Sequence, residues 1–269
     1  MAKYKKKRAR ELQHDRFRDT TMGFFDRLGD TLEGKGRTIL YALGGVLLAG
    51  ILVVVFVKWS HKKNDEARQA IGRAITITKA PVMTTPVAGN TELTFSSEVE
   101  RAQRAIAEFE KVAAKYGDPY RTESRYFIAS NRLVLDRPKG LTELEELSKS
   151  NITEVATLSK FALAQAKESD GKLDEAAQLY AEIARLNSPA ISAETANLRL
   201  AKVYEKQGKK KEASDLLFNL VDSARKAKGP DNQPLPTSAA AREAANELQK
   251  LDPDRYAQLP PETPPLLAG

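Results

Sequence analysis

The stretch Gly171–Ile183, GKLDEAAQLYAEI, recurs as GKKKEASDLLFNL at Gly208–Leu220, at a constant offset of 37 residues. Small and apolar residues take the same places in both copies, as where Ala176 matches Ala213. Because residues three and four apart share one face of an α-helix, each copy predicts a helix with one apolar stripe. A single unit of this length cannot bury its stripe alone, so the repetition predicts a stack of helical units.

Two earlier segments extend the series. At an offset of 71 residues, about two repeats, Ala105, Phe109 and Val112 have the spacing of the second half of the Gly171 copy. A further copy is therefore expected between them. A degenerate one fits there, with Tyr126-Phe127-Ile128-Ala129 followed by Leu141, Leu144 and Leu147.

The best-preserved elements are Leu200-Ala201, Tyr204, Gly208 and Ala213. This pattern resembles the tetratricopeptide (TPR) repeat, a 34-residue helix–turn–helix unit. The small Ala201 and Ala213 let two helices approach closely, and Gly208 can take the left-handed conformation that ends the first helix. The fold is predicted to be all-α, a TPR-like helical-hairpin solenoid; an ordinary helical bundle is the alternative.

A second decisive stretch, TILYALGGVLLAGILVVVFV at residues 38–57, has no charged residue, and 13 of its 20 residues are Leu, Ile, Val or Phe. Twenty residues of α-helix are enough to cross a hydrocarbon layer of about 30 Å. No small-x-small cleavage site follows, as it would in a signal peptide, because the run passes into Lys58-Trp59-Ser60-His61. We expect a retained transmembrane helix; a buried core helix is the alternative.

The chain is expected to divide into five parts. These are a basic head with an amphipathic helix (1–37), the span (38–57), a juxtamembrane helix and loop (58–96), the solenoid (97–228), and a linker, terminal helix and Pro-rich tail (229–269). A helix from Asp65 to about Thr78 is predicted as separate from the span. Within the solenoid, Arg137-Pro138-Lys139-Gly140 is predicted to be a turn.

The charge is unevenly placed. Residues 1–37 hold 11 Lys and Arg against 6 Asp and Glu, so +5 of the net +7 belongs to the head. No nucleic-acid binding is expected of the main domain, which lacks a basic excess. The head favours a cytoplasmic N-terminus, although it could also bind anionic lipid or ribosomal RNA. Immediate flanks do not decide the orientation, with four Lys or Arg before the span and five after it.

The residues of common catalytic and metal sites are scarce. The chain has no cysteine, and its two histidines, His14 and His61, flank the span. Phosphate- and dinucleotide-binding glycine motifs do not occur. We therefore expect no enzyme activity, cofactor or metal, and the carboxylates Glu143, Glu145 and Glu146 are expected to be solvated.

A solenoid of helical hairpins presents a concave surface that typically grips a peptide or another protein. In the TPR register the first helix of each unit lines that surface. The candidate partner-binding residues are Gln165, Glu168, Lys202 and Glu205. Gly45-x-x-x-Ala49 in the span could also support a homodimer within the lipid bilayer.

The layout resembles the YfgM-like family over residues 35–228, on the span, the segment Ala105–Tyr120 and the segment Leu198–Tyr204. The resemblance implies a bacterial inner-membrane protein with one span, a cytoplasmic N-terminus and a periplasmic TPR-like domain. It also implies the translocon or periplasmic chaperones as partners, in secretion or envelope protein folding. The long head, the loop at 77–96 and the Pro-rich tail depart from that family. Two functions stay open: a tethered adaptor, or a structural subunit of a larger inner-membrane complex.

Overall fold

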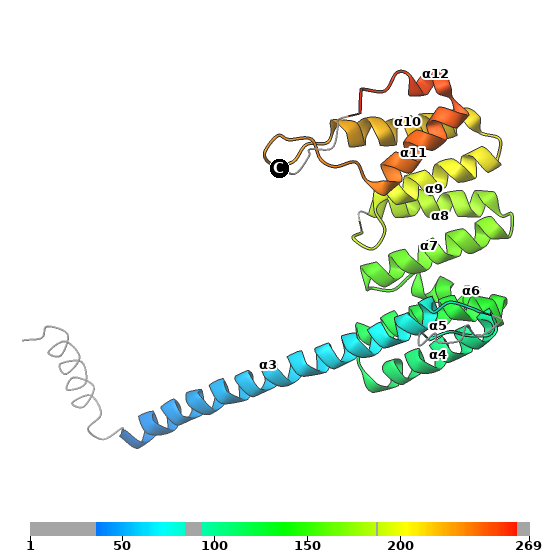
Figure 1. Ribbon diagram of the computed structural model, residues 1–269. Helices are drawn as coiled ribbons and strands as arrows, with labels where there is room; N and C mark the ends of the chain where they lie inside the picture. Colours follow the sequence, from blue (N-terminus) through cyan, green and yellow to red (C-terminus); the bar gives the residue numbers. More distant parts are fainter. Residues whose placement is uncertain (1–35, 84–92, 187, 263–269) are drawn as a thin grey trace, which may run out of the picture. The chain divides into compact units, whose positions relative to one another are not determined.

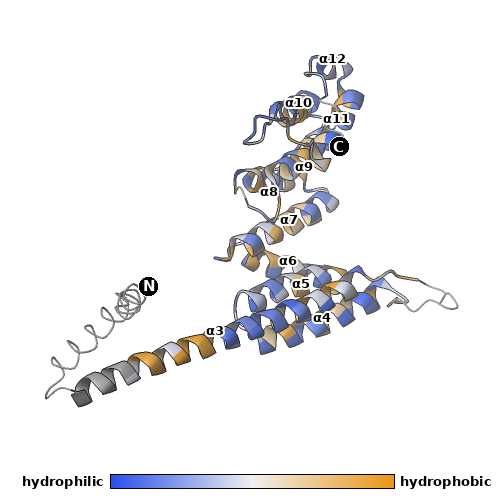
Figure 2. Cartoon of the chain, turned by 60° about the vertical axis from the view of Figure 1, so that its left-hand side comes forward, coloured by the Kyte–Doolittle hydropathy of each residue, from blue (hydrophilic) through white to orange (hydrophobic). Residues whose placement is uncertain are grey.

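The computed structural model describes residues 36–83, 93–186 and 188–262, and the described chain divides into two units that meet after Asp65. In the first unit, the first 30 residues of α3 (Gly36–Lys79) carry the apolar run, part of which is orange in Figure 2. Among the residues that the structure describes, one helix is long and apolar enough to cross a membrane, judged by length and composition alone. The basic head and the last seven residues lie outside the described part of the chain.

Helix α3 changes character along its length. Residues Val46–Val57 are apolar on every side and exposed, with relative exposures from 44% for Val57 to 72% for Val46. After Glu66 the pattern becomes amphipathic, and Ala67, Ile71 and Ala74 are buried at 5% exposure or less. The sequence predicted two helices here, but the structure has one continuous helix, because no proline or helix-ending glycine separates them.

The second unit is a series of antiparallel hairpins (Figure 1). After α3 come α4 (Glu98–Lys115), α5 (Tyr120–Leu135), α6 (Arg137–Leu147), α7 (Thr153–Ser169), α8 (Leu173–Leu186), α9 (Ala193–Lys206), α10 (Lys210–Lys226), α11 (Ala239–Leu251) and α12 (Pro253–Tyr256). From α4 onward each helix packs on the next, while α5 also contacts α7 and α9 also contacts α11. In the described ranges no strand forms; the pairs Val82–Phe95 and Lys228–Pro234 are isolated bridges. The fold is all-α and TPR-like, with α5, α7, α9 and α11 as first helices of units.

The second helices of the units share one buried spacing, i, i+4, i+7. The small or large residues at these places are all buried: Ala105, Phe109, Val112 in α4; Gly140, Leu144, Leu147 in α6; Ala176, Tyr180, Ile183 in α8; and Ala213, Leu217, Leu220 in α10. This confirms the repeat, including the degenerate copy at 126–147, in which Gly140 and not the predicted Leu141 takes the first buried place. The stripe faces the first helices because only that side excludes water.

The first helices repeat a pair of small residues five positions apart. Ser124 and Ala129 in α5, Ser159 and Ala164 in α7, and Ala196 and Ala201 in α9 are each at most 1% exposed. Small side chains at these points let neighbouring helices approach closely. Because the pair recurs at equivalent places, this close approach occurs at the same place in each unit.

Two turns end first helices through glycine. Gly171 after α7 has φ +72° and Gly208 after α9 has φ +75°, the left-handed region that favours glycine. In both turns the following amide bonds back into the helix, Lys172 to Lys167 and Lys209 to Tyr204, each at 2.9 Å. The predicted role of Gly208 is confirmed.

The predicted turn at Arg137–Gly140 is wrong, because these residues begin α6. Pro138 lies in the first turn of the helix, where a missing N–H costs nothing, and the Asp136 side chain accepts the N–H of Lys139. Gly140 therefore belongs to the buried stripe, where the other second helices have alanine.

The solenoid core also extends past the predicted limits of 97 and 228, although the five-part division itself stays a prediction. Ala67, Ile71 and Ala74 of α3 pack with Phe109 and its neighbours in α4. At the other end, α11 packs against α9 and α10 through Ala241, Ala244 and Leu248, all 0% exposed.

Candidate functional site

The four residues predicted to bind a partner lie on two first helices, Gln165 and Glu168 on α7 and Lys202 and Glu205 on α9. We call the surface formed by these four residues the first-helix face. Gln165 and Glu205 are exposed, while the side chains of Glu168 and Lys202 are 13% and 27% exposed. The structure thus separates the four into two open positions and two that are engaged within the fold.

Glu168 joins three helices. Its carboxylate accepts the hydroxyl of Tyr180 on α8 at 3.1 Å and is paired with Lys206 at the end of α9. Burial, and then the negative charge of Glu168, raise the pKa of Tyr180, so this phenol stays protonated and keeps donating. Glu168 is therefore a structural clamp between two units.

Lys202 repeats this arrangement one unit later. Its ammonium group donates a hydrogen bond to Glu243 on α11 and lies 4.0 Å from Glu247. The hydrogen bond from Lys202 lowers the pKa of Glu243, so the pair is charged at neutral pH. These bridges run from first helix to first helix along the first-helix face.

Sequence reasoning missed Lys206 and Glu243 as partners. Lys206 directly follows Glu205 in the sequence. A search for opposite charges on successive first helices would have matched it with Glu168. Glu243 lies in α11, which the sequence set apart because the Pro/Gly-rich linker precedes it.

Gln165 and Glu205 have no side-chain hydrogen bond or ion pair within the described ranges, and both are open to solvent. An exposed amide and an exposed carboxylate on adjacent units can bond to a peptide backbone or to basic side chains. Their role in partner binding stays a prediction.

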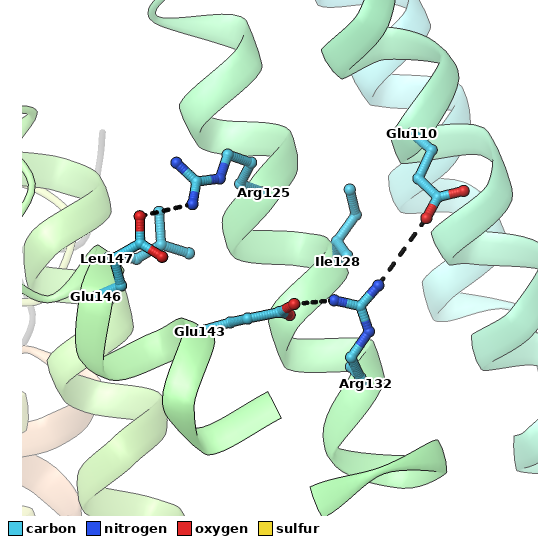
Figure 3. A pocket seen from close by; sticks show the side chains of 7 residues that line it. All are labelled: Glu110, Arg125, Ile128, Arg132, Glu143, Glu146 and Leu147. Atoms are coloured by element: carbon cyan, nitrogen blue, oxygen red, sulfur yellow. Dashed lines mark hydrogen bonds and ion pairs between the residues drawn. The ribbon is translucent and has the colours of Figure 1, made fainter. Parts of the chain in front are cut away.

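A second polar cluster lies between α4, α5 and α6 around a hollow of about 270 Å³ (Figure 3). Arg132 of α5 reaches Glu143 on α6 and lies 3.9 Å from Glu110 on α4, while Arg125 pairs with Glu146 at 2.8 Å. Glu143, expected from the sequence to be solvated, is only 27% exposed. Because both guanidinium groups already pair with carboxylates, the cluster braces three helices together.

The described residues place no three His, Cys, Asp or Glu side chains where they could hold a metal ion together. Burial raises the pKa of Glu123 on α5. The expected absence of enzyme activity, metal and cofactor stays a prediction.

No family model matches this chain, and no curated protein matches it. Among solved structures it is similar to the putative kinesin light chain nearly identical TPR-like repeats of Podosopora anserina, and to a single-substitution variant of the same protein. Identity is 19% and the TM-score 0.44 in both; the match covers 56% of this chain and 78% or 77% of the other. Below a TM-score of 0.5 this similarity carries no further weight, and the TPR-like assignment rests on the hairpins and their repeated buried positions.

Proposed function

We propose that this protein is a single-pass membrane protein whose TPR-like solenoid binds other proteins. The observation that carries the proposal is the apolar run Val46–Val57, whose large side chains are 44–72% exposed, whereas beyond Glu66 one face of the same helix is buried. A continuous exposed apolar surface that runs over twelve residues of a helix marks a site of contact with a membrane or with another protein. The large apolar residues of the span contribute about −4 to −8 kcal/mol to membrane insertion.

Charging the span is the direct test of the anchor. Leu52→Arg with Val54→Arg is expected to move the full chain from the membrane to the soluble fraction. Two arginines near the centre cost about 5–7 kcal/mol, as much as the span gains. Flotation of membranes after an alkaline wash measures the change, with Leu52→Ile/Val54→Leu as the matched control. Recovery of the unaltered chain in the soluble fraction would contradict the anchor.

The binding surface we propose is the first-helix face, with Gln165 and Glu205 as its free positions. Successive units line an extended face of this kind in helical-repeat proteins, and such faces bind peptides and proteins. Glu168 and Lys202 support it by locking neighbouring first helices together.

Because the chain has no cysteine, single substitutions can carry a photoactivatable group without background. Gln165→Cys and Glu205→Cys, so labelled in native membranes, are expected to yield the same protein adduct. Lys211→Cys, which is also exposed and lies at the start of α10, is the control and is expected to yield none. Equal adducts from all three positions would contradict a specific face.

For location we propose a bacterial inner membrane, with the basic head in the cytoplasm and the solenoid in the periplasm. The basic head and the YfgM-like resemblance of the sequence support this, as well as an accessory role in secretion or envelope protein folding. Labelling of the Glu205→Cys protein by a membrane-impermeant maleimide in spheroplasts reports the side directly.

The alternative is a structural subunit of a larger membrane complex. It is favoured by the open surface at Gly44, Gly45 and Gly50, where an added Cβ would meet nothing within 4 Å and a second helix could approach closely. Mild detergent extraction separates the two functions: a stable complex of fixed stoichiometry favours the subunit, and adducts formed only by crosslinking favour the adaptor.

A further inference from the structure

The two ends of the solenoid differ in how they are covered. At the C-terminal end α12 and the residues after it fold onto α10, where Leu259 joins the core cluster and Arg225 donates to the carbonyl of Pro260. Ser214 on α10 also donates to Asp252, at 2.7 Å. At the N-terminal end, nothing within residues 66–83, 93–186 and 188–262, the described part of this unit, plays this part. A hollow of about 340 Å³ opens between the C-terminal part of α3 and α4.

The floor of this hollow is apolar. Ala70 and Ile77 of α3 and Val112 and Tyr116 of α4 line it. These α3 residues follow each other at helical spacing beside the buried stripe of Ala67, Ile71 and Ala74. The floor is therefore continuous with the solenoid core, as a surface is where a further helix would pack.

The rim of the hollow is basic. It consists of Arg73, Arg104, Lys111 and Lys115 around the single carboxylate Glu108, and Glu66 lies 3.9 Å from Lys115. Four cations against two carboxylates leave an excess of two positive charges. Arg104, Lys111 and Lys115 are 61–67% exposed while Glu108 is 26% exposed, so an approaching partner meets positive charge first.

Glu108 also organises the rim. It pairs with Lys111 at 2.7 Å and with Arg104 at 3.6 Å, which holds both cations beside the apolar floor. Arg73 faces the same hollow and forms no ion pair with a carboxylate within the described ranges. It is thus available to a partner's carboxylate.

We propose that this hollow is a docking site for an acidic amphipathic helix of a partner protein. The helix packs its apolar stripe on the half-buried Ala70 and Ile77, beside the buried Val112, and its carboxylates meet Arg73 and Arg104. The occupant is acidic because the rim has an excess of positive charge. This site is separate from the first-helix face, so its failure would leave both the anchor and that face untouched.

The test uses the full chain in nanodiscs of zwitterionic lipid and a synthetic amphipathic helical peptide of about 18 residues, with Leu on one face and Glu on the flanks. Fluorescence anisotropy is expected to show binding that weakens as salt rises. Arg73→Glu/Arg104→Glu is expected to raise the Kd at least about tenfold. Lys210→Glu/Lys211→Glu makes the same change of charge at exposed positions of α10 and is expected to change the Kd less than about twofold.

Several outcomes would overturn the proposal: equal binding of a peptide with Lys in place of Glu, equal weakening by both charge reversals, or binding of anionic vesicles but not of the peptide at this site. Circular dichroism checks that the variants fold. If Arg73→Glu/Arg104→Glu fails to fold, the peptide Kd is measured instead with Arg73→Gln/Lys115→Gln, which removes two positive charges from the same rim. Glu205→Cys can be combined with Arg73→Glu/Arg104→Glu and labelled as above. The adducts of this variant then report, independently of the hollow, whether the first-helix face still binds its partner.

Discussion

Phe109→Ala is expected to lower the free energy of unfolding of the solenoid by about 3–5 kcal/mol. Phe109 is 0% exposed and stacks on Phe127 of α5, with ring centroids 4.7 Å apart. It also lies in the cluster with Ala67 and Ile71 of α3, so it touches three helices at once. Removing the ring leaves a cavity that these helices cannot fill without shifting.

Urea unfolding followed by circular dichroism measures the change, and Val99→Ala is the matched control on the same helix. Val99 is 47% exposed, so its loss is expected to cost less than about 0.5 kcal/mol. Because the units of a solenoid touch only their neighbours, hydrogen exchange is expected to speed up first in α3–α5. Equal costs for the two variants would show that this cluster is not a core.

Gly140→Ala is expected to destabilise the solenoid by about 1–3 kcal/mol, although alanine is the best helix former. A Cβ at Gly140 would lie 2.8 Å from the backbone nitrogen of Leu133 and 3.0 Å from the carbonyl oxygen of Ala129. These are backbone atoms of α5, so the two helices would have to separate. Thermal and urea unfolding of the full chain measure the loss.

Gly72→Ala is the control and is expected to have the opposite sign. Gly72 lies in α3, where an added Cβ meets nothing within 4 Å, so only the helix preference of alanine acts. The expected gain is about 0.5–1 kcal/mol. If both variants changed stability in the same direction, the close approach of α5 and α6 would be disproved.

The repeat could be predicted from sequence because it depends on spacing alone. Residues at i, i+4 and i+7 share one helix face wherever the helix lies, so Ala176, Tyr180 and Ile183 had to lie on one apolar face once a helix formed. Gly208 likewise ends its helix through its own backbone freedom. The apolar run at 38–57 belongs to the same class, since its length and composition are local properties.

Other features depended on what packs against a segment. Arg137–Gly140 has the composition of a turn, yet it starts α6, because proline is compatible with the first turn and glycine allows close contact with α5. Residues 66–79 and α11 join the solenoid core because each finds an apolar surface on a neighbouring unit. A sequence pattern reports an apolar face but not its partner.

The first-helix face shows the same division in its charges. The sequence alone determined that Gln165, Glu168, Lys202 and Glu205 occupy equivalent positions on two successive first helices. Only the tertiary structure decided that Glu168 and Lys202 are engaged, with Lys206 and Glu243, while Gln165 and Glu205 stay open. The physical reason is that helical periodicity alone places a side chain on one face of its own helix. An ion pair between units joins two residues that are 38 or 41 positions apart in the chain, so it forms only when tertiary packing brings their helices side by side.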